Sequence, residues 1–236
     1  MNVLPKDIIL FVVEGVTDDT ALGHLLRQAL IPKDVRVYFM GCDITTSHGI
    51  TPANVIAELG RGIGLHIRKY GWTFEDIKLI VHIIDTDGAF IPEDKIVEDK
   101  VMQYPAGENK MFYDDEIRVF NRNQYVKRNL QKKSNVNKLY SKSEIANRPY
   151  RMIYMSNGLE HVLHNIANPL EEEKMDLAYE FEDRFYDNIP GFIDFICNSD
   201  FSVKGDYIDS WKYIKDGTNS LKRHSNLGIL VEEMLK

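Results

Sequence analysis

The sequence has 236 residues and is acidic, because 36 aspartates and glutamates outnumber 29 lysines and arginines to give a formal net charge of −7. Apolar residues make up 44% and charged residues 28% of the chain, a globular balance that excludes a mainly disordered protein. Two cysteines are too few for a disulfide scaffold or a cysteine-based zinc site.

The first half of the chain predicts strands that alternate with helices. Short apolar runs rich in β-branched residues predict buried strands over residues 8–13, 35–40 and 77–84. Leucines at helical spacing predict a helix after the first strand, capped by Thr17 or Asp18. Pro52 opens a second predicted helix that runs to about residue 70.

The second half begins irregularly. Residues 111–120 predict an exposed hairpin strand, because acidic side chains suit the edge of a sheet. The basic stretch after it predicts a solvated helix or a loop. A fourth strand is predicted over 151–155, followed by helices over 157–165, 175–186, 191–197 and 227–235.

This order of elements predicts the α/β fold class, with a mostly parallel four-stranded sheet covered by helices on both faces. We expect a core over residues 5–165, which contains an irregular and basic insertion at about 89–148. Residues 166–236 are expected to form a helical C-terminal portion packed on this core.

Polar side chains follow three of the predicted strands. They are Glu14, the pair Asp85 and Asp87, and the pair Ser156 and Asn157. Ligands of parallel α/β sheets bind outside the carboxyl ends of the strands, so these side chains mark a candidate site. Asp85 and Asp87 face the same way in extended geometry and can share a hard cation such as Mg²⁺, which also binds phosphates. A third carboxylate can orient a water or take its proton, which suits phosphoryl transfer.

Glu14-Gly15 with Asp18, followed further along by Asp85-Thr86-Asp87, resembles the motifs of the Toprim family. Topoisomerases, primases, recombination proteins and nucleases of the OLD type share that domain. The resemblance implies a Rossmann-like core in which Glu14 is a general acid/base. Glu14, Asp85 and Asp87 would then be the catalytic residues and ligands of Mg²⁺ or Mn²⁺, supported by Gly15 and Asp18.

Ser156-Asn157, followed by Glu160 and His164, is similar to a stretch of RloB-like proteins, which are associated with phage defence. This chain departs from their pattern at Gly158, where proline is usual, and its glutamate comes one residue early. The resemblance implies supporting roles for Ser156, Asn157 and Glu160.

The segment from residue 117 to residue 151 is strongly basic, with ten lysines and arginines against one glutamate, and aromatic residues lie among them. Such a segment can follow a phosphate backbone and stack bases. The expected nucleic-acid contacts are Arg122, Lys127, Arg128, Lys132 and Lys133. The alternative is a solvated helix whose bases pair with the acidic helices after residue 170.

Together these features predict metal-dependent cleavage of phosphodiester bonds in DNA or RNA, with a role in phage defence by family resemblance. A first alternative is a non-catalytic subunit of a defence complex that binds nucleic acid or a nucleotide. A second follows from Asp85-Thr86-Asp87-Gly88, which resembles the nucleophile motif of haloacid-dehalogenase-like phosphatases. That reading makes Asp85 the nucleophile and assigns an acidic motif to Asp206 and Asp209.

Partners and location follow from what the sequence lacks. No G-x-x-x-x-G-K-[ST] motif is present, so an ATPase or other defence partner is expected to be a separate chain. The apolar stripe of the last predicted helix indicates either core packing or a homodimer face. The longest apolar run is too short to span a bilayer and no signal peptide is evident, so we expect a cytoplasmic protein without membrane contact.

Overall fold

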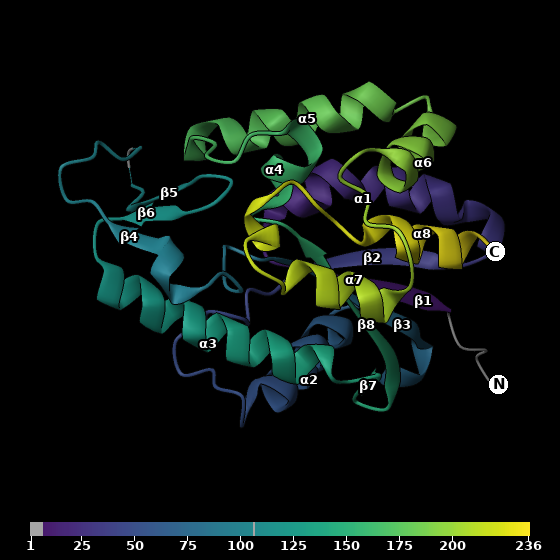
Figure 1. Ribbon diagram of the computed structural model, residues 1–236. Coiled ribbons are helices and arrows are strands. Elements are labelled where there is room, and N and C mark those ends of the chain that lie inside the picture. Colours follow the sequence, from purple (N-terminus) through teal and green to yellow (C-terminus); the bar gives the residue numbers. More distant parts are fainter. Residues whose placement is uncertain (1–6, 106) are drawn as a thin grey trace.

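A central five-stranded sheet organises the computed structural model, which describes residues 7–105 and 107–236 (Figure 1). Its strands, in spatial order, are β2 (Arg36–Gly41), β1 (Ile8–Val13), β3 (Ile77–Asp85), β8 (Arg148–Met155) and β7 (Glu144–Ile145). The first four are parallel and β7 is antiparallel to β8. The predicted α/β class with a mostly parallel sheet is therefore confirmed.

The fifth strand was not predicted, and its length explains why. β7 has two residues and returns to β8 through Ala146 and Asn147, whose φ angles of 49° and 60° form a tight left-handed turn. Hairpin turns of this kind usually carry Asn-Gly or Asp-Gly, which are absent here. Two residues are also too few for an alternating pattern to be recognised.

Helices cover both faces of the sheet, because side chains of alternate strand residues point to opposite sides. Phe11 and Ile83 face one layer, whereas Leu10 and Ile84 face the other. The first layer contains α1 (Val16–Leu30), α4 (Leu159–His164), α5 (Lys174–Phe185), α6 (Ile189–Asn198) and α8 (Leu227–Leu235). The second contains α2 (Val55–Arg68), α3 (Arg122–Tyr140) and α7 (Tyr207–Ile214).

The helices after residue 165 contribute to both layers. α5, α6 and α8 share the apolar cluster of α1, while α7 inserts the fully buried Trp211 into the cluster on the opposite face. Leu227, Leu230 and Val231 of α8 are buried in the first cluster. The apolar stripe of the last helix therefore packs in the core, as one of its two interpretations predicted.

A small second sheet stands beside the central one (Figure 1). It contains β4 (Ile96–Glu98), β6 (Ile117–Val119) and β5 (Lys110–Phe112), in that spatial order. β5 and β6 form the antiparallel hairpin that was predicted as a single strand over 111–120. Val136 and Leu139 of α3 pack on the central sheet, whereas Tyr125 packs on the small one, so α3 joins the two.

No helix within the described ranges combines the length and the apolarity needed to cross a bilayer.

Candidate active site at the carboxyl ends of the strands

The strand order defines where a ligand is expected. β1 has β2 on one side and β3 on the other, so the chain changes direction across the sheet between its second and third strands. Ligands of open α/β sheets bind outside the carboxyl ends of the strands at such a switch point. Glu14 follows β1 and Asp85 ends β3, so both lie there.

The loops after β3 and β8 fix each other. Asp87 and Asn157 both have left-handed backbones, with φ of 48° and 56°, and the Asp87 N–H donates to the Asn157 carbonyl at 3.0 Å. The Asn157 N–H in turn donates to Thr86 Oγ1 at 2.9 Å. Left-handed non-glycine residues persist only where their surroundings hold them, and they are frequent at functional sites.

Gly88 is required where this loop meets the small sheet. Its φ is 66°, and an added Cβ would lie 2.2 Å from Ile117 Cδ1 of β6. A side chain at this position would be strained by the backbone angle, and the Ile117 side chain would have to move to make room for it. The glycine therefore allows the inserted segment to pack against the Asp85–Asp87 loop.

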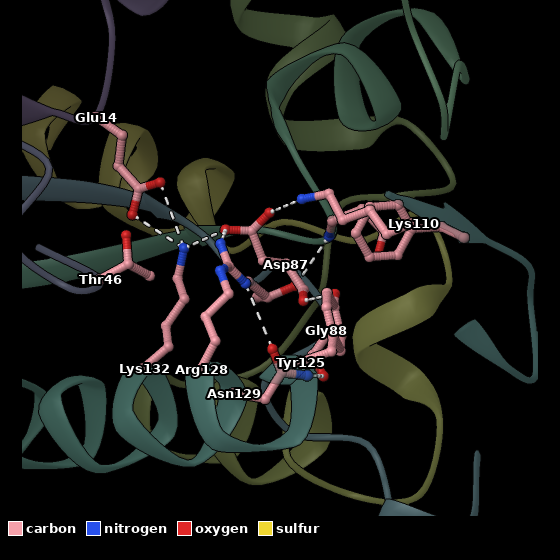
Figure 2. A network of polar contacts seen from close by, with 12 residues as sticks. Glu14, Thr46, Asp87, Gly88, Lys110, Tyr125, Arg128, Asn129 and Lys132 are labelled. Atoms are coloured by element: carbon pink, nitrogen blue, oxygen red, sulfur yellow. Dashed lines mark hydrogen bonds and ion pairs between the residues drawn. The ribbon is translucent and has the colours of Figure 1, made fainter. Parts of the chain in front are cut away.

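A buried ammonium group joins two of the predicted catalytic carboxylates. Lys132 of α3 is 0% exposed, and its Nζ lies 2.6 Å from Asp87 Oδ2 and 3.2 Å from Glu14 Oε1 (Figure 2). Thr45 Oγ1 also donates to Glu14, at 3.0 Å. Although burial alone would lower it, Asp87 and Glu14 hold the pKa of Lys132 above its usual value, so this lysine is charged.

Asp87 is held by two further cations (Figure 2). Lys110 Nζ of β5 lies 3.0 Å from Oδ1, and Arg128 Nη2 of α3 lies 2.7 Å from Oδ2. Burial opposes ionisation, but Lys132, Lys110 and Arg128 together hold the pKa of Asp87 well below its usual value. This carboxylate is therefore ionised at neutral pH.

The carboxylates on the other side of the site behave oppositely. Burial raises the pKa of Asp85 well above its usual value, and the charges of Glu14, Asp18 and Asp87 raise it further. Burial raises the pKa of Asp18 to about 7 and also raises those of Glu14 and Glu160. Carboxylates that disfavour one another's ionisation have a high affinity for a proton or for another cation.

Two adjoining hollows open onto these carboxylates. The first contains about 620 Å³ of empty space and is bordered by Glu14, Asp18, Asp85 and Glu160. The second contains about 520 Å³ and is bordered by Asp85, Asp87, Lys110, Asn157 and Glu160. Both hollows are open to solvent and lined by these carboxylates, so a substrate group can reach them.

The fit of a divalent metal differs between the predicted ligands. In the described part of the chain, no group of three or more His, Cys, Asp or Glu side chains is arranged to hold a metal ion. Both oxygens of Asp87 bind protein cations instead, and Glu14 binds Lys132. Asp85 and Glu160 fit a hard cation better, because one oxygen of each lies beside Gly158. Asp85 Oδ2 and Glu160 Oε2 lie 3.4 and 3.5 Å from the position that a Cβ on Gly158 would occupy, so a side chain there would contact both oxygens. Mg²⁺ typically takes one or two carboxylates and fills its shell with water and phosphate oxygens.

The other predicted supporting residues have structural roles at the edge of the site. Gly15 is the N-cap of α1, and its N–H donates to Asp18 Oδ2 at 2.8 Å. The predicted cap, Thr17 or Asp18, is therefore wrong, because Asp18 lies inside the first turn. Ser156 Oγ is buried and accepts from the His224 N–H at 2.7 Å. Asn157 Nδ2 contacts Leu221 O, while its Oδ1 is buried without a partner in the described structure.

The basic helix α3 does not expose all of the cations that were expected to contact nucleic acid. Arg128 and Lys132 point into the site, and Arg122 contacts Glu93 and the Ile96 carbonyl. Lys127 and Lys133 remain exposed. The alternative that these bases pair with the acidic helices after residue 170 is wrong for Arg122, Arg128 and Lys132, whose partners lie before residue 100.

Sequence reasoning missed Lys110 and the buried position of Lys132. A signal for Lys132 is present in the sequence, because Tyr125, Val136 and Leu139 lie at helical spacing from it and so share its face of α3. A lysine within such a stripe must meet buried acids, because an unpaired charge is too costly to bury. Lys110 offers no comparable signal, since it lies in a three-residue strand.

Comparison of this chain with models of protein families, with curated proteins and with solved structures gave no match.

Proposed function

We propose that the protein is a divalent-metal-dependent nuclease that cleaves phosphodiester bonds with a Toprim-like set of carboxylates. The observation that carries this proposal is the state of Asp85. It ends a central strand at the switch point, borders both hollows, and has its pKa raised by burial and by three other carboxylates. A cation bound here would offset the repulsion among these carboxylates, and Lys110, a cation that a phosphate can contact, borders one of the same hollows.

The residues divide into two roles. Asp85, with Glu160, would hold Mg²⁺ or Mn²⁺, which when bound neutralises charge on the phosphate and lowers the pKa of a coordinated water. Burial raises the pKa of Glu14 above its usual value, and this carboxyl borders the hollow that contains Asp85, which suits a general acid/base. Asp87 is a metal ligand only if one of its three cations gives way; otherwise it positions Lys110 and Arg128 toward the phosphate.

The phosphatase alternative has less support. Its acidic motif would need Asp206 or Asp209 near Asp85. Asp206 instead caps α7 by accepting from the Asp209 N–H at 2.7 Å, and Asp209 pairs with Lys212. Neither aspartate borders the hollows that contain Asp85.

One observation supports the alternative that the protein binds nucleic acid or a nucleotide without cleaving it. Three cations already neutralise Asp87, so the site can attract a phosphate without turning it over. The role in phage defence rests on resemblance alone, since function lies in sites and not in folds.

The test is a cleavage assay on single- and double-stranded DNA and RNA with Mg²⁺ or Mn²⁺. Wild type is compared with Glu14→Gln, Asp85→Asn and Asp87→Asn, and with Asp209→Asn as a matched control on the surface. Circular dichroism verifies that each variant folds. A generic phosphomonoester is included as a second substrate.

The proposal expects metal-dependent cleavage by wild type and Asp209→Asn and its loss in Asp85→Asn and Glu14→Gln. Cleavage that survives in Asp85→Asn would contradict it. Binding without cleavage under every metal would favour the binding-only function. Hydrolysis of the phosphomonoester alone would favour the phosphatase.

A further inference from the structure

A third hollow continues the site past Asp87. It contains about 1,010 Å³ of empty space between the small sheet and the first turns of α3. Glu108 and Lys110 border both this hollow and the second one, and Arg128 borders this one while binding Asp87. The three hollows therefore form a continuous series. It begins at Glu14, Asp85 and Glu160, passes the cations that bind Asp87, and ends at the small sheet.

The far end of this series carries side chains that suit a nucleobase. Phe120, which follows β6, is 51% exposed at the edge of the third hollow. Its backbone is fixed, because the Phe120 N–H donates to the Asn109 carbonyl at 2.9 Å. Exposed amide side chains border the same hollow, namely Asn109, Asn121 and Gln124. An aromatic ring stacks on any base, and amides can hydrogen-bond base edges.

The cations between the two ends can still receive a phosphate. Lys110 and Arg128 use one donor group each on Asp87, and Arg128 also donates to Asn129 Oδ1 at 3.4 Å, whereas an ammonium has three N–H donors and a guanidinium five. Their side chains are 21% and 32% exposed, so the remaining donors can reach solvent. Glu108 is the acidic residue of the described lining and weakens this attraction without cancelling two cations.

We propose that the third hollow binds an unpaired base of single-stranded nucleic acid, stacked on Phe120, while the adjoining phosphate contacts Lys110 and Arg128. This inference rests on the proposed nuclease function and names its substrate class. A base inside a duplex offers no free face to Phe120, because its neighbours cover both faces. Unpaired strands or loops are therefore the preferred substrate.

The test measures equilibrium binding in EDTA, where metal-dependent cleavage cannot occur. Fluorescence anisotropy follows a labelled single-stranded 12-mer of DNA or RNA, and the matching duplex, titrated with wild type, Phe120→Ala and Phe120→Trp. Tyr179→Ala is the control, because Tyr179 of α5 is similarly exposed, at 53%, but borders none of the three hollows. Phe120 lies outside the three apolar clusters, and circular dichroism verifies that its variants fold.

The inference predicts that Phe120→Ala weakens single-strand binding on the order of tenfold, the effect expected from the loss of one stacked base. Phe120→Trp and Tyr179→Ala should bind like wild type, and the duplex should bind more weakly than the single strand. Equal affinity of Phe120→Ala and wild type, or equal affinity for duplex and single strand, would overturn it.

The two proposals fail in different ways. Binding that depends on Phe120, without cleavage under any metal, would support the subsite and reject the nuclease. Cleavage by wild type, with single-strand binding unchanged in Phe120→Ala, would reject the subsite and leave the nuclease standing.

Discussion

Lys132 is the residue that most changes the interpretation of the site. Its ammonium is completely buried between Glu14 and Asp87, where the family resemblance implied a metal between carboxylates. A buried ammonium must be paired with acids, and its removal would in turn leave those acids with an uncompensated buried charge. The charge of Lys132 therefore holds Glu14 and Asp87, two of the three proposed catalytic residues, in place and lowers the pKa of both below the values that burial alone would give.

Replacement of Lys132 by methionine should destabilise the protein. The substitution keeps the length of the side chain but leaves Glu14 without its ammonium partner, and breaking a buried ion pair from one side typically costs about 3–5 kcal/mol. Urea denaturation should detect this loss in the free energy of unfolding. Lys133→Met is the matched control, because the adjacent side chain is exposed and its replacement should cost less than about 0.5 kcal/mol. Equal stability of Lys132→Met and wild type would refute the role of the buried ammonium.

Asp18 should make the stability of the protein fall with rising pH. Burial raises its pKa from 3.8 to about 7, so the folded protein retains a proton that the unfolded chain has released. The free energy of unfolding then decreases between about pH 4 and about pH 7 and changes no further above that window. Asp18→Asn keeps the shape but does not titrate, so its decrease should be smaller.

The check is urea denaturation from pH 4 to pH 8 in EDTA. Asp19→Asn serves as the control, because the Asp19 side chain is half-buried, at 45% exposed, and pairs with Arg27 on the helix surface. Parallel stability curves for wild type and Asp18→Asn would disprove the raised pKa.

At the scale of elements, the sequence predicts helices and strands that carry long regular patterns. It does not predict short elements whose place depends on tertiary contacts. The strand at 8–13 and the helix at 227–235 have the predicted bounds, because the apolar run covers the whole strand and the apolar stripe covers the whole helix. The positions of Glu14 and Asp85 could be predicted as well, because each lies at the end of a strand that the sequence predicts. β4 and β7 have three and two residues, and their pairing depends on partners distant in sequence. Lys110 could not be assigned to the site for the same reason.

α7 was also not predicted, although it carries one of the largest buried side chains. Trp211 is 0% exposed, and its Nε1 donates to the Met152 carbonyl of β8 at 3.3 Å. The helix has eight residues, which is too short for a clear apolar period. Contacts with Tyr154 and Tyr140, and not local sequence, define its place on the sheet.

Trp211→Ala should therefore cost about 3–5 kcal/mol in the free energy of unfolding, as expected for removal of a large buried aromatic side chain. Ile208→Ala on the same helix should change it by less than about 0.5 kcal/mol, because Ile208 is 56% exposed. Thermal or urea denaturation of the two variants provides the comparison. Similar losses for both would mean that α7 does not pack on the sheet as described.

At the scale of the whole molecule, the site is assembled from two parts of the chain. The central sheet contributes Glu14 and Asp85, while the inserted segment contributes Lys110, Arg128 and Lys132. Lys132 and Arg128 reach Asp87 from α3, and Lys110 reaches it from β5 (Figure 2). This division explains the contrast between Asp87, whose pKa is low, and Asp85, whose pKa is high.

The central claim is that the acidic half of this site binds a divalent cation through Asp85. Titration of Mn²⁺ monitored by electron paramagnetic resonance, without nucleic acid, whose phosphates bind Mn²⁺ themselves, tests it most directly. The account predicts that wild type and Asp209→Asn bind Mn²⁺ and that Asp85→Asn, verified as folded, binds at least tenfold more weakly. Binding that is equally strong in Asp85→Asn, or no binding by wild type at millimolar Mn²⁺, would contradict the account.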